Sequence, residues 1–264
     1  MEKLLGKTPE QLAEIASERR WHSYTANQIS QWLYRHDVKS VDGMTNLPLS
    51  IRREIEGSFI IGRTAPVGVQ ESLDGTRKYL FRTDSGNYIE SAYIPEGRRH
   101  TLCVSSQAGC KMACGFCMTG KQGFSGNLDA GSIINQVLSI AERSLLTNIV
   151  YMGMGEPLDN TENVLDSINS LSSDKALGMS PRRITLSTIG IIPELEKFLE
   201  KSSCHVAVSL HSPFSEERAG LVPAEKLHPI KDVVELLRSY GNDRQRRFSF
   251  EYIVFREINH SQRH

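Results

Sequence analysis

Apolar residues recur at helical spacing through the first 60 residues, in three stretches. A Thr-Pro-Glu-Gln capping box at residues 8–11 opens the first stretch, with Pro9 at the first helical position. A second box at residues 25–28 opens the next, and Pro48 opens the third, which Gly57 ends. The pattern predicts a small helical domain over residues 1–60. By itself it indicates a binding or adaptor domain, or only a packing appendage.

Between residues 61 and 98 the pattern changes to the alternation typical of short strands. Asp74-Gly75 predicts a hairpin turn, and residues 84–87 predict a second reversal. We therefore expect strands at 67–71, 78–82 and 88–93 that form a small antiparallel β extension. Glu90 lies in the middle of the last strand, on the same face as Tyr88 and Ala92. A carboxylate in that position is more often a solvated residue than a base.

From residue 99 to residue 264 strand patterns alternate with helix patterns. Strands are expected at 101–105, 148–152, 183–187, 205–210 and 248–254, and helices at 129–145, 161–171, 193–201 and 229–240. Strands joined by helical crossovers predict an α/β fold with a parallel sheet, here an incomplete (βα) partial barrel. Functional groups gather at the C-terminal strand ends of such folds. Four of these strands end in the cysteine loop or in the segments 153–157, 187–190 and 209–212, which are rich in glycine and polar residues.

Composition narrows the choice of function only a little. Lys plus Arg and Asp plus Glu are both 31, so the net charge of zero gives no sign of a nucleic-acid binder, although residues 98–100 and 244–247 are locally basic. No apolar run approaches a membrane span, and the N-terminus lacks the features of a signal peptide. Four of five cysteines are clustered, which is unlike a disulfide framework. We therefore expect a cytoplasmic protein with no membrane partner.

Three cysteines in a C-x3-C-x2-C array, Cys110, Cys114 and Cys117, predict a metal centre. Three thiolates on a 4Fe-4S cluster leave one iron open, which can chelate S-adenosylmethionine, and an electron from the cluster can then break a carbon–sulfur bond of that cofactor. The spacing and the aromatic residue before the last cysteine favour this hypothesis over zinc. A zinc site would need a fourth ligand, with Cys103, His100 or Cys204 as candidates.

The other strand ends carry candidate ligand contacts. The GMGEP run at 153–157 is not a G-x-G-x-x-G fingerprint, so it does not indicate a dinucleotide site. Its glycines would allow a ligand to approach the backbone, and Glu156 could accept hydrogen bonds from an ammonium group. Ser187, Ser209 and His211 could bind a ribose or a carboxylate. Alternatively, they cap the helices that follow them.

The runs TLCVSSQAGCKMACGFCMTG, YMGMGEPLDN, ITLSTIG and AVSLHSP resemble the radical-SAM adenosine methyltransferases of bacteria, and the resemblance extends over essentially the whole chain. It implies methylation of carbon 2 of an adenosine in 23S rRNA and in tRNA, with a 4Fe-4S cluster and S-adenosylmethionine as cofactors. It also implies an RNA-binding N-terminal domain, an electron donor such as flavodoxin and a monomer. A sister branch methylates carbon 8 of the ribosomal base, and the sequence leaves that choice open.

The resemblance implies roles for individual residues. The cluster ligands are matched by Cys110, Cys114 and Cys117, and the pair that grips the methionine end of the cofactor by Gly155 and Glu156. Further cofactor contacts are matched by Ser187, Ser209, Leu210 and His211. Glu90 matches the proton acceptor, and Cys103 matches a thiol that resolves the enzyme–RNA adduct. Near a cluster and a cofactor cation, the pKa of that thiol would be lowered.

In the resembled family a methyl-carrying cysteine lies in a C-terminal segment, which has no counterpart before His264. Cys204 begins a strand and is interpreted as a core cysteine. We therefore expect residues 1–264 to assemble the cluster and cleave S-adenosylmethionine, but not to methylate RNA. The alternatives are a radical-SAM enzyme for a small molecule or peptide, a non-catalytic RNA- or zinc-binding protein, and a non-functional fragment.

Overall fold

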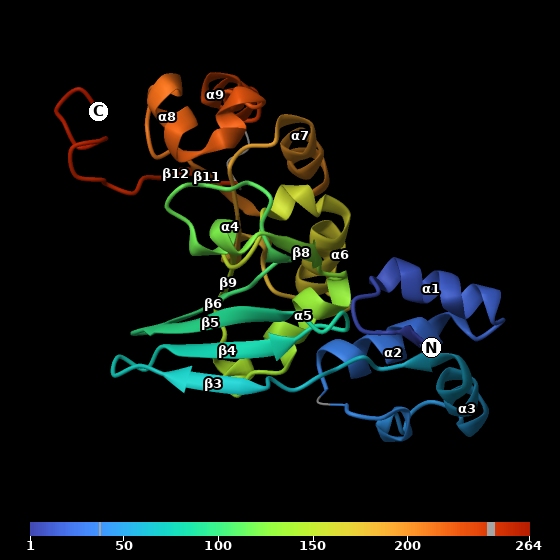
Figure 1. Ribbon diagram of the computed structural model, residues 1–264. Helices are drawn as coiled ribbons and strands as arrows, with labels where there is room; N and C mark the ends of the chain where they lie inside the picture. The colour runs from blue at the N-terminus through green and yellow to red at the C-terminus, as the bar shows by residue number, and fades with distance from the viewer. Residues whose placement is uncertain (37, 242–245) are drawn as a thin grey trace.

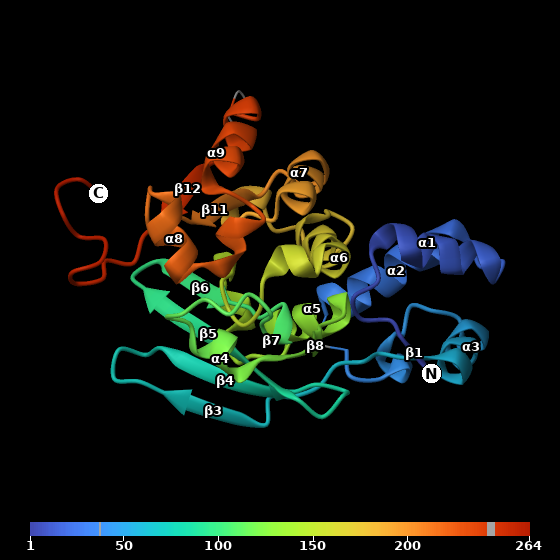
Figure 2. The same ribbon diagram turned by 45° about the horizontal axis from the view of Figure 1, so that its top comes forward.

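The computed structural model describes residues 1–36, 38–241 and 246–264 (Figure 1). Arg244, in the second basic cluster of the sequence, lies outside these residues. The N-terminal helices lie to one side of the molecule, and both views place them beyond the end of the main sheet (Figures 1 and 2). No helix of the described chain is both long and apolar enough to cross a membrane.

Three helices make up the N-terminal part, as the apolar pattern predicts: α1 (Pro9–Glu18), α2 (Ser23–Tyr34) and α3 (Leu49–Ser58). The capping box at Thr8 is confirmed by both of its reciprocal hydrogen bonds. The second box is wrong, because α2 begins two residues earlier and the Thr25 hydroxyl is buried without a partner. Gly57 does not end α3, which continues to Ser58. Strands β1 (Glu2–Lys3) and β2 (Phe59–Ile60) pair in parallel and tie the two ends of this part together.

An eight-stranded sheet forms the centre of the molecule, in the order β12-β11-β10-β9-β6-β5-β4-β3. The parallel part consists of β6 (Arg99–Cys103), β9 (Asn148–Tyr151), β10 (Ile184–Thr188), β11 (His205–Ser209) and β12 (Phe248–Glu251). The antiparallel part consists of β3 (Gly68–Glu71), β4 (Arg77–Arg82) and β5 (Tyr88–Glu96). The predicted α/β class is therefore confirmed. The β extension continues the main sheet through the pairing of β5 with β6.

Helices cover one face of the parallel part: α5 (Ala130–Leu138), α6 (Thr161–Ser172), α7 (Ile192–Lys201) and α9 (Ile230–Ser239). The strands follow one another in sequence order, and right-handed crossovers then place these four helices on the same side. Residues that face the helices, such as Ile149, Leu186 and Val206, are fully buried. The predicted helix at 129–145 is too long, because α5 ends at Leu138 and a single 3-10 turn follows at Arg143–Leu145.

The opposite face of the sheet carries polar side chains near the C-terminal ends of its strands. Paired residues in register share a face, so Ser209 and Glu251 on neighbouring strands point the same way, as do Cys103 and Ala92. We call this the open face, because α5, α6, α7 and α9 cover the other one. Over its C-terminal edge run short elements that the sequence did not predict: β7 (Gln107–Gly109), α4 (Met118–Gln122), β8 (Phe124–Asn127) and α8 (Ser215–Leu221).

Candidate active site

The cysteine loop leaves β7 and enters α4 at the C-terminal edge of the sheet. Its three clustered cysteines line one cavity of about 590 Å³ together with Gly155, Glu156, Ser187, Ser209 and His211. Gly109 opens the loop with φ of +77°, and an added Cβ there would lie 1.8 Å from the Gly123 carbonyl oxygen. Only glycine permits this approach, which closes the loop on itself through a Cys110 N–H bond of 3.0 Å to the same carbonyl.

The chemistry of these thiols fits a polynuclear iron cluster. All five cysteines are free, and burial raises the pKa of Cys110 and raises the pKa of Cys114 to about 11. The cavity therefore disfavours thiolates unless a cation compensates them, as an iron core does. Across the described residues, no three His, Cys, Asp or Glu side chains are gathered closely enough for a single metal ion. A cluster of several irons spreads its ligands farther apart.

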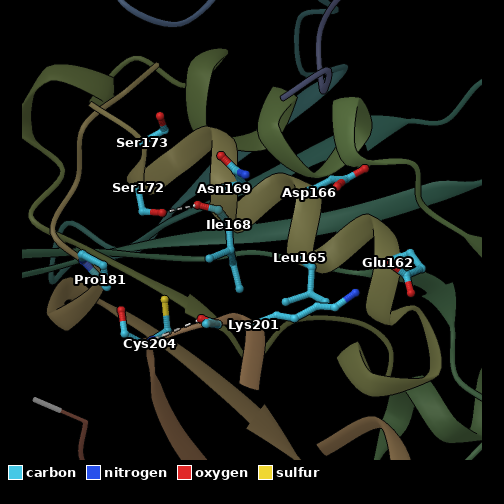
Figure 3. Close-up of a pocket in the computed structure, with 12 residues that line it drawn as sticks. Glu162, Leu165, Asp166, Ile168, Asn169, Ser172, Ser173, Pro181, Lys201 and Cys204 are labelled. Carbon is cyan, nitrogen blue, oxygen red and sulfur yellow. Dashed lines mark hydrogen bonds between the residues drawn. The ribbon is translucent and has the colours of Figure 1, made fainter. Parts of the chain in front are cut away.

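The candidate fourth ligands for zinc lie elsewhere. His100 is at the beginning of β6, where its Nδ1 is 2.5 Å from the Tyr93 hydroxyl. Cys204 lies just before the N-terminal end of β11. It lines a separate cavity of about 450 Å³ between α6 and α7 (Figure 3). It is 1% exposed, which confirms the prediction of a core cysteine. Neither residue contributes to the cavity at the cysteine loop.

Glu156 presents a buried carboxylate to this cavity. Its oxygens accept hydrogen bonds from Thr188 Oγ1 at 2.6 Å, from the Ile189 N–H at 3.0 Å and from the Leu158 N–H at 3.1 Å. Burial raises its pKa to about 7, and the three donors oppose that rise without overcoming it. The side chain is fixed in position and has a charge that a bound cation would stabilise.

The glycines before Glu156 are required by the protein's own packing. A Cβ on Gly153 would lie 2.7 Å from Ser105 Oγ, and one on Gly155, where φ is +98°, would lie 2.5 Å from Gln107 Cβ. Both glycines therefore let the turn after β9 pass close to the end of β6 and to β7. The Gln107 side-chain oxygen then accepts the Glu156 N–H at 2.9 Å, which locks the turn.

Ser187 and Ser209 share one acceptor. Both hydroxyls donate to Oε2 of Glu251, at 2.8 and 3.1 Å respectively. The alternative in which these serines cap the following helices is wrong, because the residues that precede α7 and α8 are Ile191 and Phe214. Both hydroxyl hydrogens are committed to Glu251, so the serines offer lone pairs to a ligand in the cavity.

His211 has a strained backbone with φ of +55° and is 3% exposed. Its Nδ1 accepts the Ile253 N–H at 3.2 Å, and its carbonyl accepts a bond from Asn259 Nδ2 at 2.5 Å. Burial lowers its pKa to about 4, so the ring is neutral at pH 7. Its ring packs edge-on against Phe116 of the cysteine loop. Leu210 does not line the cavity, and its backbone N–H donates to the Glu251 carbonyl at 3.0 Å.

Glu90 and Cys103 lie outside the cavity, on the open face beside it. Cys103 is paired with Ala92 on β5, two residues from Glu90, and the Glu90 carboxylate forms a 3.0 Å ion pair with Lys78 Nζ. The lowering of the Cys103 pKa beside a bound cluster and a cofactor cation stays a prediction, and the polypeptide itself acts in the opposite direction. Burial raises that pKa to about 11, and the charge of Glu251 adds to the rise.

Sequence reasoning missed several residues that build this site. Glu251 was placed in the middle of a strand expected at 248–254, although β12 ends at that residue. The rule that polar residues mark C-terminal strand ends would have found it. No pattern in the sequence indicated a role for Arg218. Its guanidinium is fully buried, pairs with Glu225 and donates to the carbonyls of Ile189, Ser209 and Leu210.

Two family models match the chain. The model of the radical SAM superfamily matches residues 104–264, and that of the ribosomal RNA large subunit methyltransferase N-terminal domain matches residues 2–61. Curated relatives named "Probable dual-specificity RNA methyltransferase RlmN" are 49% identical in Phocaeicola vulgatus, over 98% of this chain and 74% of the relative, and 50% identical in Porphyromonas gingivalis, over 99% and 76%.

A solved structure shows the same likeness in three dimensions. The crystal structure of a radical SAM methyltransferase from Sphaerobacter thermophilus superimposes with a TM-score of 0.90 at 36% sequence identity. The match covers all of this chain and 79% of the other. The shared architecture therefore includes the N-terminal helices, the antiparallel strands and the parallel sheet with its cysteine loop.

Proposed function

Since the chain belongs to the radical SAM superfamily and, within it, to the dual-specificity RNA methyltransferases, we propose that residues 1–264 carry the cluster site, the cofactor site and the base-facing residues of an enzyme that methylates carbon 2 of an adenosine in 23S rRNA and tRNA. The observation that carries the proposal is the convergence of two groups of residues. The three cysteines of the loop and the strand-end contacts share one cavity, and Glu90 and Cys103 lie on the open face next to it.

In this proposal Cys110, Cys114 and Cys117 hold the 4Fe-4S cluster, and Gly155, Glu156, Ser187, Ser209 and His211 hold S-adenosylmethionine, with Leu210 contributing through its backbone. When bound, the cluster and this cofactor supply one-electron chemistry that no protein side chain provides. The protein's part is to bind and to orient. Glu156 accepts hydrogen bonds from the cofactor's ammonium group, and the serine lone pairs accept from its hydroxyls.

The RNA side of the reaction takes place on the open face. A target adenosine must leave its stack to reach this face, as RNA recognition usually requires. Glu90 is half exposed there, with Lys78 Nζ 3.0 Å from its carboxylate, and we assign it to take a proton from the base as a general base. Cys103, on the neighbouring strand, is the thiol that we assign to resolution of the enzyme–RNA adduct.

Cluster assembly tests the cofactor half of the proposal. We expect the chain, reconstituted without oxygen, to bind about four irons and four sulfides. On reduction it should convert S-adenosylmethionine to 5′-deoxyadenosine and methionine. Cys110→Ala should lose both properties, whereas Cys204→Ala should keep them because Cys204 lines a different cavity. A stable zinc protein, or a cluster that survives Cys110→Ala, would contradict the proposal.

A chromosomal Cys110→Ala substitution in the source organism tests the RNA half. We expect 2-methyladenosine to disappear from nuclease digests of 23S rRNA and tRNA, as measured by mass spectrometry. Loss of 8-methyladenosine instead would move the protein to the carbon-8 branch. Unchanged levels of both nucleosides would contradict an RNA substrate and favour a small molecule or peptide.

The remaining features of the proposal concern partners and location. Cleavage of S-adenosylmethionine consumes an electron, so a low-potential donor of the flavodoxin class is required. Free thiols and an iron–sulfur centre fit a reducing compartment, and we place the protein in the cytoplasm. We propose that it acts as a monomer, and size-exclusion chromatography with light scattering tests that assignment.

A further inference from the structure

The open face continues past Glu90 on strands β4 and β5. Because β5 runs antiparallel to β6, the residues before Ala92 extend in the direction in which β6 enters the active site. Tyr88 follows Glu90 on this face, with Arg82 as its direct partner on β4. The ring of Tyr88 is 54% exposed, and Arg82 is exposed beside it. This part of the face continues, along β4 and β5, the surface that carries Glu90.

These two side chains have no polar partner in the described part of the chain. Within residues 1–36, 38–241 and 246–264, nothing forms a hydrogen bond or ion pair with the Arg82 guanidinium or the Tyr88 hydroxyl. The other face of the same strands is different, since Tyr79, Phe81 and Ile89 are all buried there. The strands therefore bury apolar side chains on one side and carry Tyr88 and Arg82 as directly paired residues on the other.

The Cβ atoms of two directly paired strand residues, such as Tyr88 and Arg82, lie within about 5.5 Å of each other. Both planes stack on nucleobases, and the guanidinium also binds phosphate. The distance from Glu90 to Tyr88 is two strand residues, or about 7 Å. A base bound at Glu90 would therefore place its neighbour in the RNA over the ring of Tyr88.

The surroundings favour RNA over an apolar partner. Lys78 lies on the same face of β4 as Arg82, so the strand presents a cation on each side of Leu80. The hairpin after Arg82 contacts the N-terminal domain through an ion pair between Asp84 and Lys3. The Tyr88–Arg82 pair thus lies on the part of the open face next to the hairpin that contacts the domain matched by the ribosomal RNA methyltransferase N-terminal model.

We infer that Tyr88 and Arg82 form a stacking subsite for an unpaired nucleotide that flanks the target adenosine. This inference rests on the proposed function, because it assigns a further contact to the same RNA substrate. It adds two positioning residues that hold the RNA strand while Glu90 and Cys103 face the target base.

The test measures binding of a fluorescein-labelled RNA hairpin with unpaired adenosines in its loop, by fluorescence anisotropy. Tyr88→Ala should weaken binding about tenfold, since stacking of one base on an aromatic ring is lost, whereas Tyr88→Phe keeps the ring and should bind within about twofold of the parent. Arg82→Ala should weaken binding and reduce the slope against salt by about one. Arg238→Ala, an exposed arginine on α9, is the control and should change neither quantity.

A second measurement reports the stacking itself. A 2-aminopurine next to the target adenosine should be quenched by the parent and by Tyr88→Phe, and not by Tyr88→Ala. Equal affinity and equal quenching for the parent and Tyr88→Ala would overturn the inference and leave the proposed function to the chromosomal test above. An equal loss on a fully paired RNA stem would also overturn it, because a stem offers no unpaired base. If the unsubstituted chain binds no RNA hairpin, the inferred RNA contact is wrong.

Discussion

Ser187 and Glu251 join two strands that are not neighbours. Ser187 lies near the end of β10 and Glu251 ends β12, with β11 between them, and the hydroxyl donates to the carboxylate at 2.8 Å. Ser209 on the intervening strand donates to the same oxygen. One carboxylate therefore orients polar groups from three adjacent strands toward the cavity at the cysteine loop.

Removal of this carboxylate should weaken cofactor binding. Glu251→Ala leaves two hydroxyls without their acceptor, and we expect the affinity for S-adenosylmethionine to fall about tenfold, since a hydrogen bond to a charged group contributes about 1.5–3 kcal/mol. Glu251→Gln keeps an acceptor oxygen and should lose less. Equilibrium dialysis with the reconstituted protein measures the effect, and Glu235→Ala on the exposed side of α9 is the control. Equal affinities for Glu251→Ala and the control would contradict this role.

Glu156 should make stability fall as pH rises. Its pKa in the folded chain is raised to about 7 from the ordinary value of 4.5, so the folded state holds the proton more tightly than the unfolded state. The free energy of unfolding must then decrease between about pH 4.5 and 7, by on the order of 3 kcal/mol from this group. Urea unfolding of the cluster-free chain and of Glu156→Gln across this range measures the difference. Parallel pH profiles would show that burial does not perturb this carboxyl.

Gly155→Ala should be strongly destabilising. The residue has φ of +98°, and a Cβ would lie 2.5 Å from Gln107 Cβ, so the substitution combines left-handed strain of about 1–2 kcal/mol with a steric clash. Gly57→Ala is the matched control. It lies within α3 with no atom within 4 Å of its added Cβ, and it should stabilise by about 0.5–1 kcal/mol. Thermal unfolding should therefore shift in opposite directions for the two variants, and a shift in the same direction would refute the packing argument.

Arg218→Met should destabilise the chain by about 3–5 kcal/mol, because it leaves the buried Glu225 charge unpaired and three strand-end carbonyls without a donor. The double substitution of Arg218 and Glu225 by Met should lose less, since no charge is then left in the interior. Guanidinium unfolding of both variants gives the comparison. If the double variant is as unstable as the sum of the two single variants, the ion pair is not the source of the loss.

Glu90→Gln should abolish methylation without affecting the cofactor site. Loss of a general base costs about 10²–10⁴-fold in rate, and Glu90 does not line the cofactor cavity. We expect 2-methyladenosine to disappear from cellular RNA while cluster content and 5′-deoxyadenosine formation in the purified chain stay unchanged. Glu96→Gln, on the same face of the same strand, is the control. Normal 2-methyladenosine in the Glu90→Gln strain would remove this residue from the reaction.

Local sequence determined the elements whose signals are themselves local. The Thr8 capping box acts within one turn of helix, and the structure contains both of its bonds. The hairpin turn at Asp74-Gly75 and the alternation around Glu90 likewise predicted β4 and β5. The spacing of the three loop cysteines indicated their shared role, because residues so close in the chain share one loop in any fold. By contrast, the short elements β7, β8 and α8 have too few residues for a period to emerge.

Only the tertiary structure decided which side chains meet. The sequence marked Ser187, Ser209 and His211 at strand ends, but Glu251, which joins the two serines, became visible once β12 paired in register with β11. Arg218 and Asn259 bind backbone carbonyls that lie far from them in the chain, and no local pattern encodes such partners. The tertiary structure also buries the Cys103 thiol, which raises its pKa in the polypeptide itself. The sequence by itself thus determined the chemistry of the cysteine loop, and the long-range pairing of the sheet determined the cavity around it and the open face beside it.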